Sequence, residues 1–109
     1  MPWTNAGGVD TDGGVETAED EAITVYTRVF ATGARTLAVD ASGDIWVGGS
    51  ANRYHEKLNG ETGQPVAGTL FNTGTGGYGG LIDGNGVLWS ASGPDAPILR
   101  YNTADGTYT

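Results

Sequence analysis

The sequence lacks cysteine altogether and has one histidine, one methionine and four prolines among its 109 residues. Without cysteine there is neither a disulfide framework nor a thiolate to bind a metal or act as a nucleophile. No apolar run approaches the roughly 18 residues that cross a membrane, so we expect no membrane partner. Basic side chains are also few, five against 13 acidic ones, which gives a net charge of −8. Such a chain repels phosphate backbones, so we expect no nucleic-acid partner.

Residues that favour helices are scarce as well. Twenty glycines and only 17% charged residues disfavour helices, since a glycine in a helix interior costs about 1 kcal/mol relative to alanine. Short apolar runs separated by glycine-rich turns are typical of an all-β protein. The length limits the chain to one small domain.

The sequence does contain an internal repeat. Residues 37–47 read LAVDASGDIWV, and residues 81–90 read LIDGNGVLWS. An offset of 43 residues aligns Asp83 with Asp40, and the tryptophans of the two segments with each other, without a gap. Self-similarity at a period of about 40 to 50 residues is typical of propeller blades and solenoids.

The repeat predicts four short strands in each copy, an outer strand followed by three inner ones. We expect them at 23–30, 37–39, 45–47 and 55–58, and again at 66–72, 81–82, 88–90 and 98–101. Four strands per 43 residues form the unit of a β-propeller blade. The predicted architecture is two tandem blades of 43 residues: an outer strand plus first blade over 23–65, and an outer strand plus second blade over 66–109. Residues 1–22 are acidic and rich in glycine, and we interpret them as an arm or as the remnant of a preceding blade.

Two blades cannot close a ring by themselves. We expect the outer strand at 23–30 to complete the blade at 79–102 of a neighbouring copy, so that head-to-tail contacts close a full propeller by strand-swapped homo-oligomerisation. Two, three or four chains would give four, six or eight blades, and we favour the trimer. The alternative is a fragment of a longer tandem array whose other blades complete the ring.

The motif in residues 37–47 and 81–90, hydrophobic–Asp–x–x–Gly–x–hydrophobic–Trp, resembles blades of the streptogramin lyase (virginiamycin B lyase) and NHL-type propeller group. The resemblance covers about eleven residues in each repeat and implies a propeller fold. It also implies histidines and a glutamate at the channel mouth of the lyases, whereas this chain has the single histidine His55. We therefore carry over no catalytic residue, and we interpret His55 as a surface residue.

Motifs for cofactors and metals are incomplete. The segment 74–79, GTGGYG, matches the dinucleotide fingerprint, but that fingerprint requires a following helix and here a strand is predicted. Asp10, Asp12 and Glu21 have the spacing of a calcium loop, but Val15 occupies the position that requires glycine. We expect no cofactor and no metal site, and we interpret the acidic turn residues as caps of their own turns. Trp46 and Trp89 are predicted to pack between blades.

The candidate ligand-binding residues are polar, aromatic and cationic side chains on the loops expected at one rim: Arg35, Asn52, Arg53, Tyr54, Tyr78 and Asp95. Such groups on loops over a rigid scaffold suit a small-molecule or carbohydrate ligand. The predicted function is a non-enzymatic, self-assembling propeller module that acts as a scaffold or ligand-binding ring. The alternatives are a fragment of a larger propeller enzyme of the streptogramin-lyase type, and an engineered or reconstructed propeller fragment.

Overall fold

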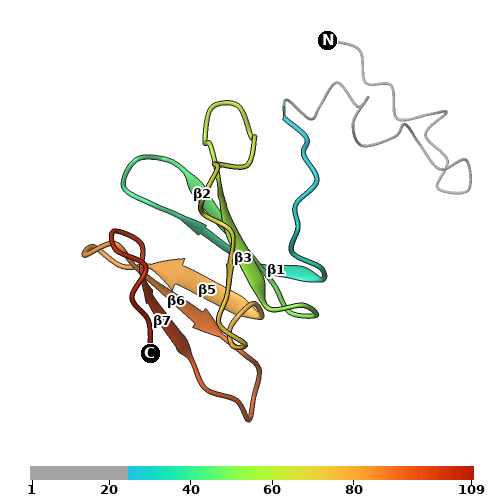
Figure 1. Ribbon diagram of the computed structural model, residues 1–109, viewed down its shortest axis with the longest axis vertical. Helices are drawn as coiled ribbons and strands as arrows, with labels where there is room; N and C mark the ends of the chain where they lie inside the picture. Colours follow the sequence, from blue (N-terminus) through green and yellow to red (C-terminus); the bar gives the residue numbers. More distant parts are fainter. Residues whose placement is uncertain (1–24) are drawn as a thin grey trace, which may run out of the picture.

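A computed structural model describes residues 25–109, which form an all-β structure without a helix in that range (Figure 1). The predicted arm at 1–22 and the candidate calcium loop lie outside the described residues. In this described part of the chain seven strands form two antiparallel sheets. Their bounds are β1 Ala34–Val39, β2 Ile45–Gly49, β3 Tyr54–Leu58, β4 Phe71–Asn72, β5 Gly79–Ile82, β6 Val87–Ala91 and β7 Leu99–Asn102.

The first sheet has the order β1-β2-β3-β4 and the second the order β5-β6-β7. Each is a meander, because successive strands pair with their neighbours in the chain. Tight turns join β1 to β2 and β5 to β6, and longer loops join β3 to β4 and β6 to β7. The prediction of inner strands is confirmed at all six places, with ends that differ by up to three residues. After the GTGGYG segment comes the strand β5 and not a helix, which removes the structural context of the dinucleotide fingerprint.

The outer strand predicted at 23–30 is not formed within a single chain, because the described residues 25–30 have no strand structure there. A strand requires a backbone neighbour to receive its hydrogen bonds, and this segment bonds to side chains instead. The Phe30 amide donates to Oε1 of Glu56 at 2.6 Å, and Nδ2 of Asn52 donates to the Phe30 carbonyl at 2.9 Å.

The prediction of an outer strand at 66–72 is correct only at its end, where Phe71 and Asn72 form β4 beside β3. Before β4 the chain touches β3 through the bridge between Pro65 and Leu58, and the Thr69 amide then turns back to the Val66 carbonyl at 3.3 Å. Proline has no amide hydrogen and glycine at 68 has a φ of +79°, so a continuous ladder cannot form there.

The two sheets pack face to face, with β1 beside β5 (Figure 1). Ala38, Trp46 and Leu88 form a buried cluster between them. Phe71, Ile82 and Tyr101 pack against this cluster at its edge. The predicted packing of Trp46 between sheets is therefore confirmed, since only 3% of this residue is exposed.

The outer faces of the two sheets retain large apolar side chains at their surface. Leu37 and Val39 of β1 are 67% and 62% exposed. On the second sheet Leu81 is 57% and Trp89 is 38% exposed. Within one chain Trp89 therefore lacks the cover that Trp46 has.

Candidate functional site

Of the predicted ligand-binding residues, four lie in the loops that precede β3, β5 and β7, namely Asn52, Arg53, Tyr78 and Asp95, while Arg35 and Tyr54 lie at the starts of β1 and β3. The structure brings two of them together: the guanidinium carbon of Arg35 lies 4.3 Å from the ring centroid of Tyr78. A cation over an aromatic face is attracted by the negative charge of the ring face. Tyr78 is 46% exposed, and Asp95 is exposed in the loop before β7. These three side chains remain accessible to a ligand.

Asn52 and Tyr54 have structural roles in the described residues. Oδ1 of Asn52 accepts hydrogen bonds from the amides of Thr32 at 3.0 Å and Tyr54 at 3.3 Å. The Tyr54 ring meets the Phe30 ring edge-on, with centroids 4.6 Å apart. Both side chains therefore hold the segment before β1 against the first sheet.

Arg53 joins the two sheets. Its backbone has a φ of +64°, in the left-handed region that side chains other than glycine rarely adopt. Its Nη1 donates to the carbonyl oxygens of Gly76 at 2.8 Å and Ser92 at 3.0 Å. The guanidinium is thus committed to two loops of the second sheet, and the strained backbone is the local cost of that placement.

A buried polar network at the contact between the sheets was missed by the sequence analysis. Oγ of Ser90 lies 3.0 Å from Oγ1 of Thr36 and 3.0 Å from Nε2 of His55. The Gly77 amide also donates to this oxygen, at 2.8 Å. We call these four residues the Ser90 network. The available signal was a break in the repeat, because serine occupies the position that Val47 holds in the first copy.

His55 is fully buried, so the interpretation as a surface residue is wrong. Its ring stacks on Phe71 with centroids 5.0 Å apart and planes 7° apart. Its Nδ1 is buried and has no hydrogen-bond partner among residues 25–109. Burial lowers the pKa of His55, and the backbone of Arg53 opposes this shift. The imidazole is therefore neutral at pH 7.

Glycine is required where the loop before β5 crosses the first sheet. At Gly77, whose φ is +96°, a Cβ atom would overlap the carbonyl of Gly49. The Gly76 amide donates to Oγ of Ser92 at 2.6 Å. These close backbone contacts place the Gly77 amide on Ser90.

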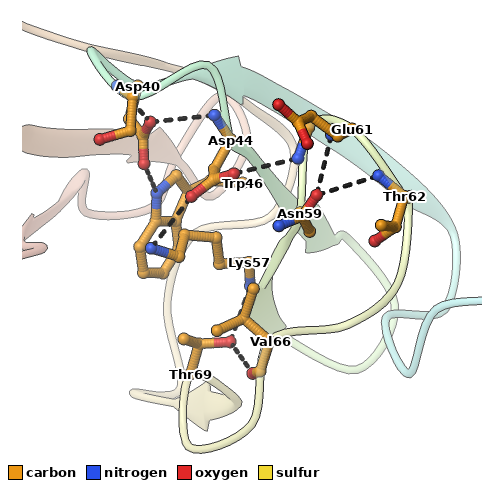
Figure 2. A network of polar contacts seen from close by, with 11 residues as sticks. Asp40, Asp44, Trp46, Lys57, Asn59, Glu61, Thr62, Val66 and Thr69 are labelled. Atoms are coloured by element: carbon orange, nitrogen blue, oxygen red, sulfur yellow. Dashed lines mark hydrogen bonds and ion pairs between the residues drawn. The ribbon is translucent and has the colours of Figure 1, made fainter.

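At the opposite rim Asp40 and Asp83 cap their own turns, as predicted, whereas Asp44 accepts a hydrogen bond from the Gly60 amide of another turn at 3.0 Å. Oδ1 of Asp40 accepts from the amides of Ser42 at 2.9 Å and Asp44 at 3.1 Å, and Oδ2 accepts from Nε1 of Trp46 at 3.2 Å (Figure 2). Asp83 makes the corresponding three bonds in the second sheet, to Asn85 and Val87 at 2.9 and 3.1 Å and to Trp89 at 2.9 Å.

The carboxyl groups of Asp83 and Asp44 have lowered pKa values. The Trp89 indole and the Val87 amide lower the pKa of Asp83. The Gly60 amide and then Lys57 lower the pKa of Asp44, whose Oδ2 lies 3.4 Å from Nζ of Lys57 (Figure 2). Hydrogen bonds to the ionised form explain both shifts. The carboxylate oxygens that could attract a cation are therefore engaged by donors of the chain itself.

We next consider whether the described residues contain a metal site, a pocket or an accessible nucleophile. Residues 25–109 contain no cluster of three histidine, aspartate or glutamate side chains suited to a metal. The same part of the chain encloses no pocket and has no helix long and apolar enough to cross a membrane. The contact of His55 with Ser90 has the atoms of a base and a hydroxyl nucleophile, but both residues are fully buried. A substrate cannot reach that hydroxyl in this arrangement.

Comparison of the chain with protein families, curated proteins and solved structures found no match.

Proposed function

We propose that the chain is a non-enzymatic, self-assembling β-propeller module, in which two blade-like sheets per chain combine with those of identical chains into a ring. The observation that carries the proposal is the repetition of one turn-and-tryptophan arrangement in two sheets packed face to face, with apolar side chains exposed on both outer faces. Exposed apolar patches of this kind mark association surfaces.

The edge of the second sheet also supports assembly. In the first sheet, β3 pairs with β4 through Tyr54 and His55, and the matching positions beside β7 are Pro97 and Ile98. Arg100 and Asn102 of β7 already bond to Thr109 and Thr107 of the same chain, but Ile98 is largely exposed, and an open stretch of strand edge can recruit a further strand. Residues 25–30 of a neighbouring copy are the counterpart of the segment that contains β4. In the proposal they become the outer strand there, which they are not within one chain.

A non-enzymatic role agrees with the position of His55, which is buried and bonded to Ser90. The ring would act as a scaffold or bind a small molecule or carbohydrate through its loop rim, where Arg35, Tyr78 and Asp95 are exposed.

The test is the mass of the full chain in solution, measured by native mass spectrometry and light scattering. We expect one discrete oligomer of the 11.2 kDa chain, with three chains favoured. A folded chain that stays monomeric up to about 100 μM, well above the micromolar range of weak complexes, would contradict the proposal.

A further inference from the structure

Two rows of cross-strand partners form the contact between the sheets within a chain. One residue from each of three neighbouring strands makes up each row: Ala38, Trp46 and Lys57 in the first sheet, and Ile82, Leu88 and Tyr101 in the second. We call them the Trp46 row and the Leu88 row. The indole of Trp46 lies 6.1 Å from the Tyr101 ring, centroid to centroid, and packs in one buried cluster with Leu88.

The offset of 43 residues generates a second pair of rows. The Trp89 row is Leu81, Trp89 and Arg100, and the Ile45 row is Val39, Ile45 and Leu58; both are again cross-strand partners. The cation is repeated as well: Nζ of Lys57 lies 5.9 Å from the Trp46 ring, and Cζ of Arg100 lies 5.7 Å from the Trp89 ring. The Trp89 row is therefore built like the Trp46 row, but its apolar members are exposed.

A single chain cannot bring the Trp89 row to the Ile45 row. Neighbouring residues of a strand point to opposite faces, so Val39 points away from the contact that Ala38 makes, and Trp89 away from the contact that Leu88 makes. The two rows thus belong to the opposite outer faces of the pair of sheets. Within one chain Ile45 and Leu58 pack with Val29 and Ala31 of the segment before β1, and the proposed transfer of residues 25–30 to a neighbouring copy removes the cover that Val29 gives. The partner that then presents an Ile45 row to Trp89 is a second copy of the chain.

We infer that the Trp89 row of one copy docks on the Ile45 row of the next, in the register that the Trp46 row adopts on the Leu88 row. This inference rests on the proposed self-assembly and specifies its surface. Trp89 would contact Ile45, as Trp46 contacts Leu88. At the equivalent positions of the other repeat, Thr36, His55 and Ser90 are replaced by Gly79, Ile98 and Val47. The Ser90 network therefore has an apolar counterpart in the contact between copies.

Cysteine cross-linking tests this register. A Cβ atom on Gly80 would lie 2.9 Å from Cγ2 of Thr36. The offset of 43 residues relates Gly80 to Leu37 and Thr36 to Gly79. The equivalent contact between copies therefore joins Leu37 of one copy to Gly79 of another. Leu37 is exposed, and a Cβ on Gly79 would meet open space. We expect the double variant L37C/G79C to form disulfide-linked multimers under mild oxidation, seen on non-reducing gels and lost on reduction.

The matched control is S42C/G79C, in which one thiol is moved to an exposed position on the turn after β1. This control should form at most a tenth of the disulfide-linked multimers that L37C/G79C forms. A discrete oligomer in which L37C/G79C cross-links no better than this control would overturn the register while self-assembly stands. A monomeric chain would overturn both.

A second measurement is independent of thiol chemistry. Trp89→Ala should raise the concentration at which the oligomer dissociates at least tenfold, with an unchanged circular dichroism spectrum of the diluted chain. The control is Leu70→Ala, since Leu70 is similarly exposed and belongs to none of the four rows. Equal dissociation of the two variants would contradict the docking surface.

Discussion

At the scale of single residues, some polar side chains bond within their own turn and others bond between the two sheets. Asp40 and Asp83 satisfy amides and an indole within their own hairpins. Ser90 instead serves three groups from three segments: Thr36, His55 and Gly77. A hydrogen bond between distant buried groups stabilises packing, and its loss leaves polar atoms buried without partners.

Ser90→Ala tests this at the residue scale. The substitution leaves the Thr36 hydroxyl, the His55 ring and the Gly77 amide without their shared partner, so we expect a loss of roughly 2 to 4 kcal/mol in the free energy of unfolding. Urea denaturation measures it. The control Ser42→Ala, at an exposed turn position, should change stability by less than about 0.5 kcal/mol. Equal effects would show that the Ser90 network contributes nothing.

Titration of His55 is the second residue-scale prediction. Its pKa in the folded chain lies below the ordinary histidine value of 6.5, so the unfolded chain binds the proton more readily. The stability that depends on neutral His55 is complete above pH 6.5 and is lost as the pH falls through the folded pKa. Asp44, Asp83 and Asp105 also have lowered pKa values, and their contribution is lost further down, below about pH 4.

His55→Gln should therefore remove the slope of stability against pH just below 6.5 and keep the acid limb near pH 4. The measurement is the urea midpoint of both proteins between pH 4 and pH 8. A wild-type slope that persists in the variant would assign the titration to another group.

At the scale of elements, a segment forms a strand where a neighbouring segment of the same chain pairs with it. Gly77 shows how tightly the loop before β5 is held, because its backbone amide reaches Ser90 while its Cα faces the Gly49 carbonyl. A side chain at this position must displace one of the two sheets.

Gly77→Ala should accordingly destabilise the chain by more than about 2 kcal/mol, through steric overlap and a φ of +96°. Gly84→Ala is the control, since a Cβ there has no atom within 4 Å. Thermal unfolding followed by circular dichroism compares the two. Similar midpoints would mean that the loop shifts at little cost.

At the scale of the whole molecule, the deletion of two N-terminal segments tests the assembly. Removal of residues 23–30 should abolish the oligomer, because the neighbouring blade loses its outer strand, whereas removal of residues 1–20 should leave it intact. Light scattering of both variants gives the masses. If the shorter deletion also dissolves the oligomer, the assignment of the outer strand is wrong.

Net charge provides a further test at this scale. Chains of net charge −8 repel one another, and salt screens that repulsion. The apparent dissociation constant of the oligomer should therefore decrease when the sodium chloride concentration is raised from 20 mM to 300 mM. Sedimentation measures this constant. An oligomer that dissociates as salt rises would indicate ion pairs at its interface and contradict an apolar one.

The sequence by itself determined the all-β class, the six inner strands and the capped turns. These features are local: an aspartate, a glycine four or fewer residues away and an alternating apolar pattern specify a hairpin without distant contacts. Only the tertiary structure decided the roles of Ser90, His55 and Arg53, and the irregular path of 25–30. Those outcomes depend on which distant groups meet when one sheet packs on the other, and sequence spacing does not contain that information.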